Sequence, residues 1–230
     1  MTKEKEPKES ILKRWSITED QLTEVIDNNP SLRGMVLGYV AEEKFDEQFL
    51  QREEITEIRK DDDHDRKKKG DRTFTYGGRS FTVEVKSLQT ATCKQASDGK
   101  WTGKAQVDGS DRRVIKFKDN TELNTTLLLR GEFDILAVNC YAFGGEWRFA
   151  FARNSDLPTS SFSKYTKEQR EQLISSMVPV SWPPQAPFTD DPISLLNEMI
   201  AAPEPVATPA VIEDAGQVAE AVDVVIVKED

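Results

Sequence analysis

The chain has 230 residues, a net charge of −10 and a hydrophobic fraction of 37%. This composition is typical of one globular domain with a sizeable core, and it excludes a fibrous or wholly disordered chain. No apolar run is long enough to cross a bilayer, and the charged first nine residues lack the apolar stretch of a signal peptide. Two cysteines are too few for a disulfide framework, so we expect free thiols, no membrane contact and a cytoplasmic location.

Charge is distributed unevenly along the chain. Residues 203–230 contain seven acidic residues and one lysine, whereas residues 60–118 contain fifteen Lys or Arg and nine Asp or Glu. A local basic excess allows contact with a phosphate backbone even when the whole chain is acidic. The composition therefore permits a nucleic-acid partner without requiring one.

Periodicity and turn residues predict an alternation of helices and strands. In chain order we expect helices at 18–27 and 31–51, strands at 54–60, 71–76, 79–87, 104–107, 114–117, 133–143 and 147–152, and helices at 165–177 and 193–200. Ser16 or Thr18 caps the first helix. Gly34 and Gly38 cost helix propensity in the second, so we expect close packing against a neighbour there. The class is α/β, with a charged leader at 1–15, a globular domain at 16–200 and a flexible acidic tail at 201–230.

The segment 71–87 reads DRTFTYGGRSFTVEVKS and predicts a two-residue β-hairpin. Gly77 and Gly78 suit the turn because both of its central residues need positive φ, which glycine adopts without a Cβ penalty. If they form the turn, counting back along both strands places Asp71 opposite Glu84.

Strand alternation sorts the hairpin's side chains onto two faces. The core face is expected to carry Phe74, Phe81, Val83 and Val85, and the polar face Asp71, Thr73, Thr82, Glu84 and Lys86. Opposed Cβ atoms lie about 4.5–5.5 Å apart, so the carboxylates of Asp71 and Glu84 would repel each other unless a cation lay between them. A hard divalent ion with oxygen ligands, Mg²⁺ or Mn²⁺, meets that need.

An acidic residue, a hairpin and then an acidic-x-Lys strand resemble the PD-(D/E)xK nuclease superfamily, which includes many restriction enzymes and Holliday-junction resolvases. The matching residues are Asp71 and Glu84-Val85-Lys86. Upstream, Gly38-Tyr39-Val40-Ala41-Glu42 is similar to the Gly-x-x-Ala-Glu pattern of the preceding helix in that superfamily. The resemblance covers roughly residues 31–152, and Gly70 stands where the motif's name has proline.

The resemblance implies a restriction-endonuclease-like core for residues 16–200: a central mixed sheet with a catalytic β-hairpin, flanked by helices. It assigns catalysis to Asp71, Glu84, Lys86 and Glu42, and a site for Mg²⁺ or Mn²⁺ to Asp71, Glu84 and the Val85 carbonyl. The implied activity is that of a metal-dependent endonuclease that hydrolyses phosphodiester bonds, with DNA as the substrate of most relatives. By analogy with small nucleases that cut both strands, we expect a homodimer.

Several assignments stay open on the residues alone. The triplet also occurs at Glu42-Glu43-Lys44, so only the opposing aspartate distinguishes Glu84-Val85-Lys86. Glu43 competes with Glu42, and Asp65 competes with Asp71, although hairpin pairing favours Asp71. The basic side chains near the hairpin are the predicted phosphate contacts, namely Lys67, Lys68, Lys69, Arg72 and Arg79. Gln89 and Gln106 are candidate polar contributors.

Two other classes of function fit the same sequence. One is a catalytically inactive nuclease-like module that binds nucleic acid or a protein partner. The other is an accessory protein of a phage or mobile element that acts by protein contact, with its acidic tail mimicking DNA or recruiting a partner. Divalent-metal binding separates these classes from an endonuclease, because only the catalytic site needs the ion.

Overall fold

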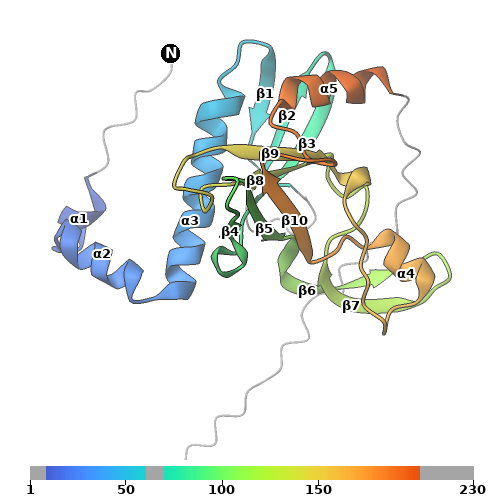
Figure 1. The fold of residues 1–230 in the computed structure, drawn as a ribbon, viewed down its shortest axis with the longest axis horizontal. Coiled ribbons are helices and arrows are strands. Elements are labelled where there is room, and N and C mark those ends of the chain that lie inside the picture. Colours follow the sequence, from blue (N-terminus) through green and yellow to red (C-terminus); the bar gives the residue numbers. More distant parts are fainter. Residues whose placement is uncertain (1–8, 61–69, 203–230) are drawn as a thin grey trace, which may run out of the picture.

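The structure is a computed structural model that describes residues 9–60 and 70–202, and it has a mixed α/β fold (Figure 1). The helices are α1 (Ile11–Arg14), α2 (Glu19–Asp27), α3 (Pro30–Phe45), α4 (Lys167–Gln172) and α5 (Pro192–Ala201), with a π-helical turn η1 (Asp46–Leu50) directly after α3 and 3₁₀ turns η2 (Thr90–Thr92) and η3 (Asn154–Asp156). The strands are β1 (Ile55–Arg59), β2 (Arg72–Tyr76), β3 (Arg79–Ser87), β4 (Lys94–Gln95), β5 (Trp101–Gln106), β6 (Asp108–Lys116), β7 (Glu122–Leu127), β8 (Ile135–Asn139), β9 (Phe149–Arg153) and β10 (Met177–Trp182).

The central sheet has five strands in the order β1-β2-β3-β8-β9. Its β3–β8 pair is parallel and the other pairs are antiparallel, so the sheet is mixed as expected. Every residue of β8 is buried, which explains why its sequence ILAVN is apolar almost throughout. Smaller sheets, β10-β5-β4 and β6-β7, complete the fold.

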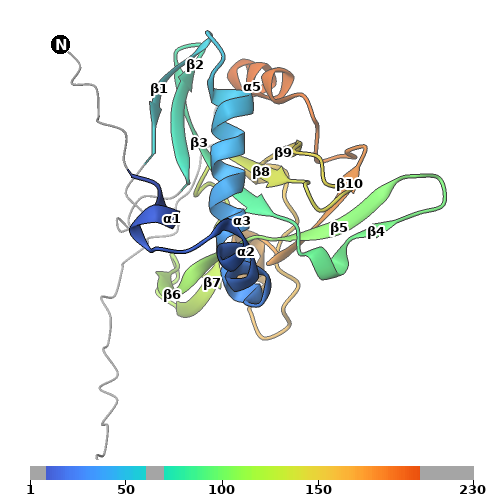
Figure 2. The ribbon, with the colours of Figure 1, turned by 90° about the vertical axis from the view of Figure 1, so that its left-hand side faces the viewer.

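Two apolar clusters cover the two faces of the central sheet. On one face, α3 and α5 contribute Phe45 and Leu196 to a cluster with the hairpin side chains. On the other, Leu136 and Val138 of β8 pack with residues of β5 and β10. Figure 2 shows α3 lying along the central sheet, with β4 and β5 projecting to one side of it.

The predicted hairpin is confirmed in register as well as in position. Tyr76 pairs with Arg79 across the turn, and both turn glycines have positive φ, +56° at Gly77 and +79° at Gly78. The predicted core face is also confirmed, because its four apolar members all join the cluster beneath α3, namely Phe74, Phe81, Val83 and Val85.

The helices predicted at 18–27 and 31–51 are confirmed, as α2 and as α3 continued by η1. Thr18 rather than Ser16 caps α2, and the side chain of Gln21 completes the capping box. No neighbour within the described chain packs closely against Gly34 or Gly38, because a Cβ at either position would meet nothing within 4 Å. The predicted leader (1–15) is described only from residue 9, and α1 lies within that part.

In the second half of the domain, the secondary structure differs from the prediction where strands pair with segments far away in the chain. The helix predicted over 165–177 is only α4, and it ends at Gln172 because Leu173 and Ile174 are fully buried in two different apolar clusters. The chain then forms β10, which pairs with β5 along six residues. Strand β7 was also not predicted, since its sequence ELNTTL has little apolar alternation.

Within the described part of the chain, no helix is long and apolar enough to cross a membrane. Cys93 and Cys140 are both free thiols, as predicted. The predicted acidic tail lies outside the described residues from position 203 onward.

The contact between α3 and the sheet gives a stability prediction. Phe45 is 0% exposed and its ring lies among Phe49, Phe149 and Phe151, so Phe45→Ala should lower the free energy of unfolding by about 3–5 kcal/mol in urea titrations. The matched control is Phe162→Ala, because Phe162 is 49% exposed, and its cost should be about 1 kcal/mol or less. Equal losses in the two variants would contradict this packing.

Candidate active site

Asp71 lies one residue before β2, and two hydrogen bonds hold it against β3. Its backbone N–H donates to the Val83 carbonyl at 2.7 Å, and its Oδ2 accepts from the Val85 N–H at 2.7 Å. Asp71 is thereby fixed next to Glu84, at the position that the hairpin register predicts.

The residue before the aspartate has a geometric reason to be glycine. Gly70 has a φ of +94°, which proline cannot adopt because its ring fixes φ near −65°. A Cβ at this position would also lie 3.2 Å from the Val83 oxygen. The departure of this chain from the proline of the motif's name therefore follows from the backbone conformation at this position.

Glu84 and Lys86 project from the face of β3 opposite to its core residues. Their side chains form an ion pair, with Lys86 Nζ 2.6 Å from Glu84 Oε1. The Lys86 side chain is 24% exposed and the Glu84 side chain is 11% exposed. A short charge-assisted hydrogen bond in this partly buried setting is stronger than a surface ion pair. The lysine is thus held beside the two carboxylates.

Electrostatics at Asp71 are unfavourable for two bare carboxylates. Burial and the neighbouring Glu84 charge raise the pKa of Asp71 from 3.8 to about 7, while Lys86 and the hydrogen bond from Val85 oppose that rise. Near neutral pH the Asp71 carboxyl is therefore part protonated in the protein alone. A cation beside it would favour the ionised form.

Lys86 stays charged despite its position. Burial lowers its pKa, but the carboxylates of Glu84 and Asp71 more than offset this, and Asp108 adds to the rise, so the net shift of the Lys86 pKa is upward. The ammonium group therefore provides a fixed positive charge at the site.

Arg72, predicted to contact phosphate, is instead a buried structural residue, and that prediction is corrected. Its side chain is 1% exposed. The Nε and Nη2 atoms donate to the Asp46 carboxylate at 2.8–2.9 Å, and Nη1 donates to Glu42 Oε2 at 3.0 Å and to the Asp71 carbonyl at 2.8 Å. The hairpin register explains this burial, because Arg72 pairs with Val83 and so lies on the core face.

The structure places Glu42, and not Glu43, near the site. Glu42 is 14% exposed and receives Lys60 Nζ at 3.1 Å as well as Arg72, whereas Glu43 is exposed. The Glu42 charge also makes a small contribution to the raised pKa of Asp71. Its connection to Asp71 passes through the Arg72 guanidinium, which bonds to both residues.

Arg79, another predicted phosphate contact, packs against other parts of the fold. Arg79 is 21% exposed; it donates to the Met199 carbonyl at 2.9 Å, lies over the Phe81 ring and is 3.7 Å from Asp134, so it joins the hairpin to α5 and β8. Lys67, Lys68, Lys69 and the rival Asp65 lie outside the described residues.

Two acidic residues that sequence reasoning missed act on this region. Asp46 follows Glu42 by four positions, so helical spacing alone would have put both on one face of α3. Asp108 acts on Lys86 from β6 and has no local signal, because only the fold brings these strands together. Gln89 donates to Gln106 at 2.6 Å, and Gln106 donates to Asp108 at 3.3 Å, so both candidate glutamines lead to this aspartate.

The fit of a divalent ion rests on the chemistry of the donor set. Within residues 9–60 and 70–202, no group of three or more His, Cys, Asp and Glu side chains is close enough to hold a metal. Asp71 and Glu84 supply two carboxylates, and burial together with the Glu84 charge raises the pKa of Asp71. Oxygen donors with excess negative charge suit Mg²⁺ or Mn²⁺, which usually keep several water ligands.

Comparisons of this chain with protein-family models, with curated proteins and with solved structures find no match.

The raised pKa of Asp71 predicts a pH dependence of stability. Because the folded-state pKa is about 7 and the ordinary value is 3.8, the folded protein binds the proton more tightly, and stability is lost as the pH rises from about 4 to about 7. In EDTA at pH 8, urea titration should therefore give Asp71→Asn a free energy of unfolding on the order of 2–4 kcal/mol higher than that of the wild type. This gain in the free energy of unfolding should vanish below pH 4. Asp190→Asn, at an exposed position, serves as the control, and a gain independent of pH would contradict the assignment.

The burial of Arg72 predicts a folding defect rather than a binding defect. Arg72→Ala leaves Asp46 and Glu42 without their shared cation, so the free energy of unfolding should fall by about 3–5 kcal/mol in urea titrations. Lys100→Ala removes an exposed ion pair with Asp98 and should change stability by about 1 kcal/mol or less. If Arg72→Ala kept wild-type stability and lost only affinity for DNA, the phosphate-contact role would be restored.

Proposed function

We propose that this chain is a metal-dependent nuclease with a restriction-endonuclease-like core, which hydrolyses phosphodiester bonds in DNA. The observation that carries the proposal is the convergence of Asp71, Glu84 and Lys86 at the open end of one β-hairpin. Asp71 is hydrogen-bonded to the residue between the other two, and Lys86 lies 2.6 Å from Glu84.

The surrounding fold supports the same proposal. The hairpin of β2 and β3 is followed in the sheet by the parallel strand β8 and the antiparallel strand β9, and helix α3 packs on the core face. This is the order of helix, hairpin and later buried strands that the resemblance to PD-(D/E)xK nucleases implies. The hairpin lies inside the sheet, so its site residues are placed on a rigid element.

The ligands that we assign to Mg²⁺ or Mn²⁺ are Asp71, Glu84 and the Val85 carbonyl. The Val85 N–H points toward Asp71, and its carbonyl points to the same edge, because both groups of one strand residue face the same neighbour. When bound, the ion would polarise the scissile phosphate and lower the pKa of a coordinated water.

The side chains have separate roles in this proposal. Lys86, kept protonated by the nearby carboxylates, neutralises charge that develops on the phosphate and orients the attacking water. Asp71 would hold the ion through its carboxylate, whose Oδ2 is fixed by a hydrogen bond from the Val85 N–H. Glu42 supports the site from α3 through Arg72, which also binds the Asp71 carbonyl.

A second candidate function is a catalytically inactive module of the same fold that binds nucleic acid or a protein. Two observations favour it: Glu84 is already paired with Lys86, and the Oε2 of Glu42 is already shared by Arg72 and Lys60. In such a module the lysine would take the place of the metal in balancing the carboxylates.

The test is cleavage of plasmid, linear and branched DNA by purified protein with Mg²⁺ or Mn²⁺. Asp71→Asn and Lys86→Met should each lower the cleavage rate by about 100-fold or more, because each removes a group aimed at the reacting phosphate or its ion. Lys100→Ala should cleave at the wild-type rate, since Lys100 is 60% exposed and pairs with Asp98.

Metal binding separates the two candidates when no cleavage is seen. In thermal unfolding, saturating Mn²⁺ should raise the Tm of the wild type and not that of Asp71→Asn, because an ion that binds only the folded protein stabilises it. If Mn²⁺ changed the Tm of both proteins equally and no cleavage were seen, the results would favour the catalytically inactive module. Unchanged cleavage in both site variants would overturn the site.

A further inference from the structure

The first thirty-two described residues form a helical segment in which no residue is fully buried. This N-terminal arm comprises residues 9–40: α1, α2 and the first eleven residues of α3. Not one residue of the arm is fully buried, and the first buried residue in the described part of the chain is Ala41. Figure 1 shows α1 and α2 at the margin of the molecule, away from the sheets.

The arm nevertheless exposes several large apolar side chains to solvent. Six of the nine exposed large hydrophobic residues in the described chain belong to it: Ile11, Trp15, Val25, Met35, Tyr39 and Val40. Between Pro30 and Val40 the only charged residue is Arg33. A surface segment with so few charged residues and so many exposed large apolar side chains is typical of an interaction surface.

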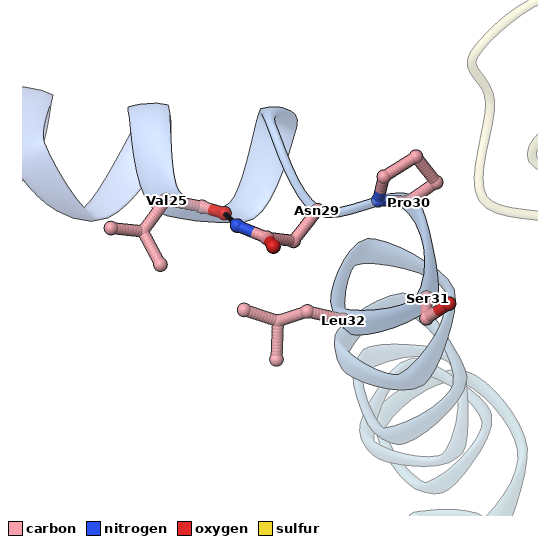
Figure 3. Close-up of a pocket in the computed structure, with 5 residues that line it drawn as sticks. All are labelled: Val25, Asn29, Pro30, Ser31 and Leu32. Atoms are coloured by element: carbon pink, nitrogen blue, oxygen red, sulfur yellow. Dashed lines mark hydrogen bonds between the residues drawn. The ribbon is translucent and has the colours of Figure 1, made fainter.

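The surface is shaped to receive another helix and an apolar side chain. Gly34 and Gly38 lie one turn apart on α3, and a Cβ on either would meet only open space, so a second backbone can approach closely. At the corner between α2 and α3, an open hollow is lined by Val25, Asn29, Pro30, Ser31 and Leu32 (Figure 3). The side chains of Val25 and Leu32 supply its apolar walls.

Charge on the arm is self-complementary. Helix α1 carries Lys13 and Arg14, whereas α2 carries four acidic residues and no basic one: Glu19, Asp20, Glu24 and Asp27. In a twofold dimer any contact between α1 of one copy and α2 of the other is made twice. The ion pair that Lys13 makes with Glu9 is highly exposed, so exchanging it for a contact with a partner costs little.

We propose that the N-terminal arm is a homodimer interface, in which two copies of this chain pack their α3 segments together and α1 of each faces α2 of the other. The acidic α2 argues against nucleic acid or an anionic membrane as the occupant, since both carry negative charge. This inference stands apart from the proposed function, because it uses none of the residues assigned to the site.

Sedimentation equilibrium of the full chain tests the proposal. The wild type should sediment at twice the monomer mass of 26.0 kDa. Met35→Glu introduces a charge into the apolar patch and should weaken dimerisation at least tenfold. Phe162→Glu, at a position that is 49% exposed outside the arm, should leave the dimer intact. A wild type that is monomeric at about 100 μM, or a dimer insensitive to Met35→Glu, would overturn the proposal.

A charge-reversal pair identifies the occupant as a second copy. One variant combines Lys13→Glu with Arg14→Glu, and the other combines Glu24→Lys with Asp27→Lys, in the last turn of α2, where cations suit the helix dipole. Each variant alone opposes like charges at both α1–α2 contacts and should be monomeric. A mixture of the two restores opposite charges at both contacts and should form heterodimers. Failure of the mixture to associate would overturn the proposed pairing of α1 with α2.

Discussion

The pairing register of β2 with β3 decides which side chains enter the core and which form the site. With Tyr76 opposite Arg79, the apolar residues of β3 face α3, and Glu84 and Lys86 face the other way. A slip of one residue would exchange the two sets, placing two charges under α3 and exposing the apolar row. The Gly77-Gly78 turn therefore sets the core and the candidate site together, and neither can change without the other.

The same register buries Arg72, and oxygen atoms from three residues accept hydrogen bonds from its guanidinium group. Asp46 and Glu42 come from one face of the helix that lies over the hairpin, and the Asp71 carbonyl supplies a third partner. A buried guanidinium with several charge-assisted bonds ties α3, the hairpin and the backbone of the candidate site into one unit. At the open end of the hairpin, Lys86 pairs with Glu84, but burial and the Glu84 charge still raise the pKa of Asp71 to about 7. Perturbed pKa values of this kind cluster at functional sites.

The molecule divides into a body with buried cores and an arm in which no residue is fully buried. The change occurs within α3: from Ala41 onward its side chains enter the core, and before Ala41 none does. Because α3 is continuous through this point, the α3 part of the arm is held in a fixed direction from the body. The proposed dimer would thus place two candidate sites in a defined relation, which suits a nuclease that acts on two strands.

Local sequence determined the hairpin, its faces, the cap of α2 and the position of Asp71 beside Glu84. Each depends on residues a few positions apart, through turn conformation, alternation or capping. Tertiary structure alone decided that Leu173 and Ile174 end α4, that β10 pairs with β5, and that Asp108 acts on Lys86. Those contacts join segments far apart in the chain, and no local period encodes them. Arg72 lies between the two cases: its burial was implicit in the hairpin register, but its partners became visible only once α3 was placed over the sheet.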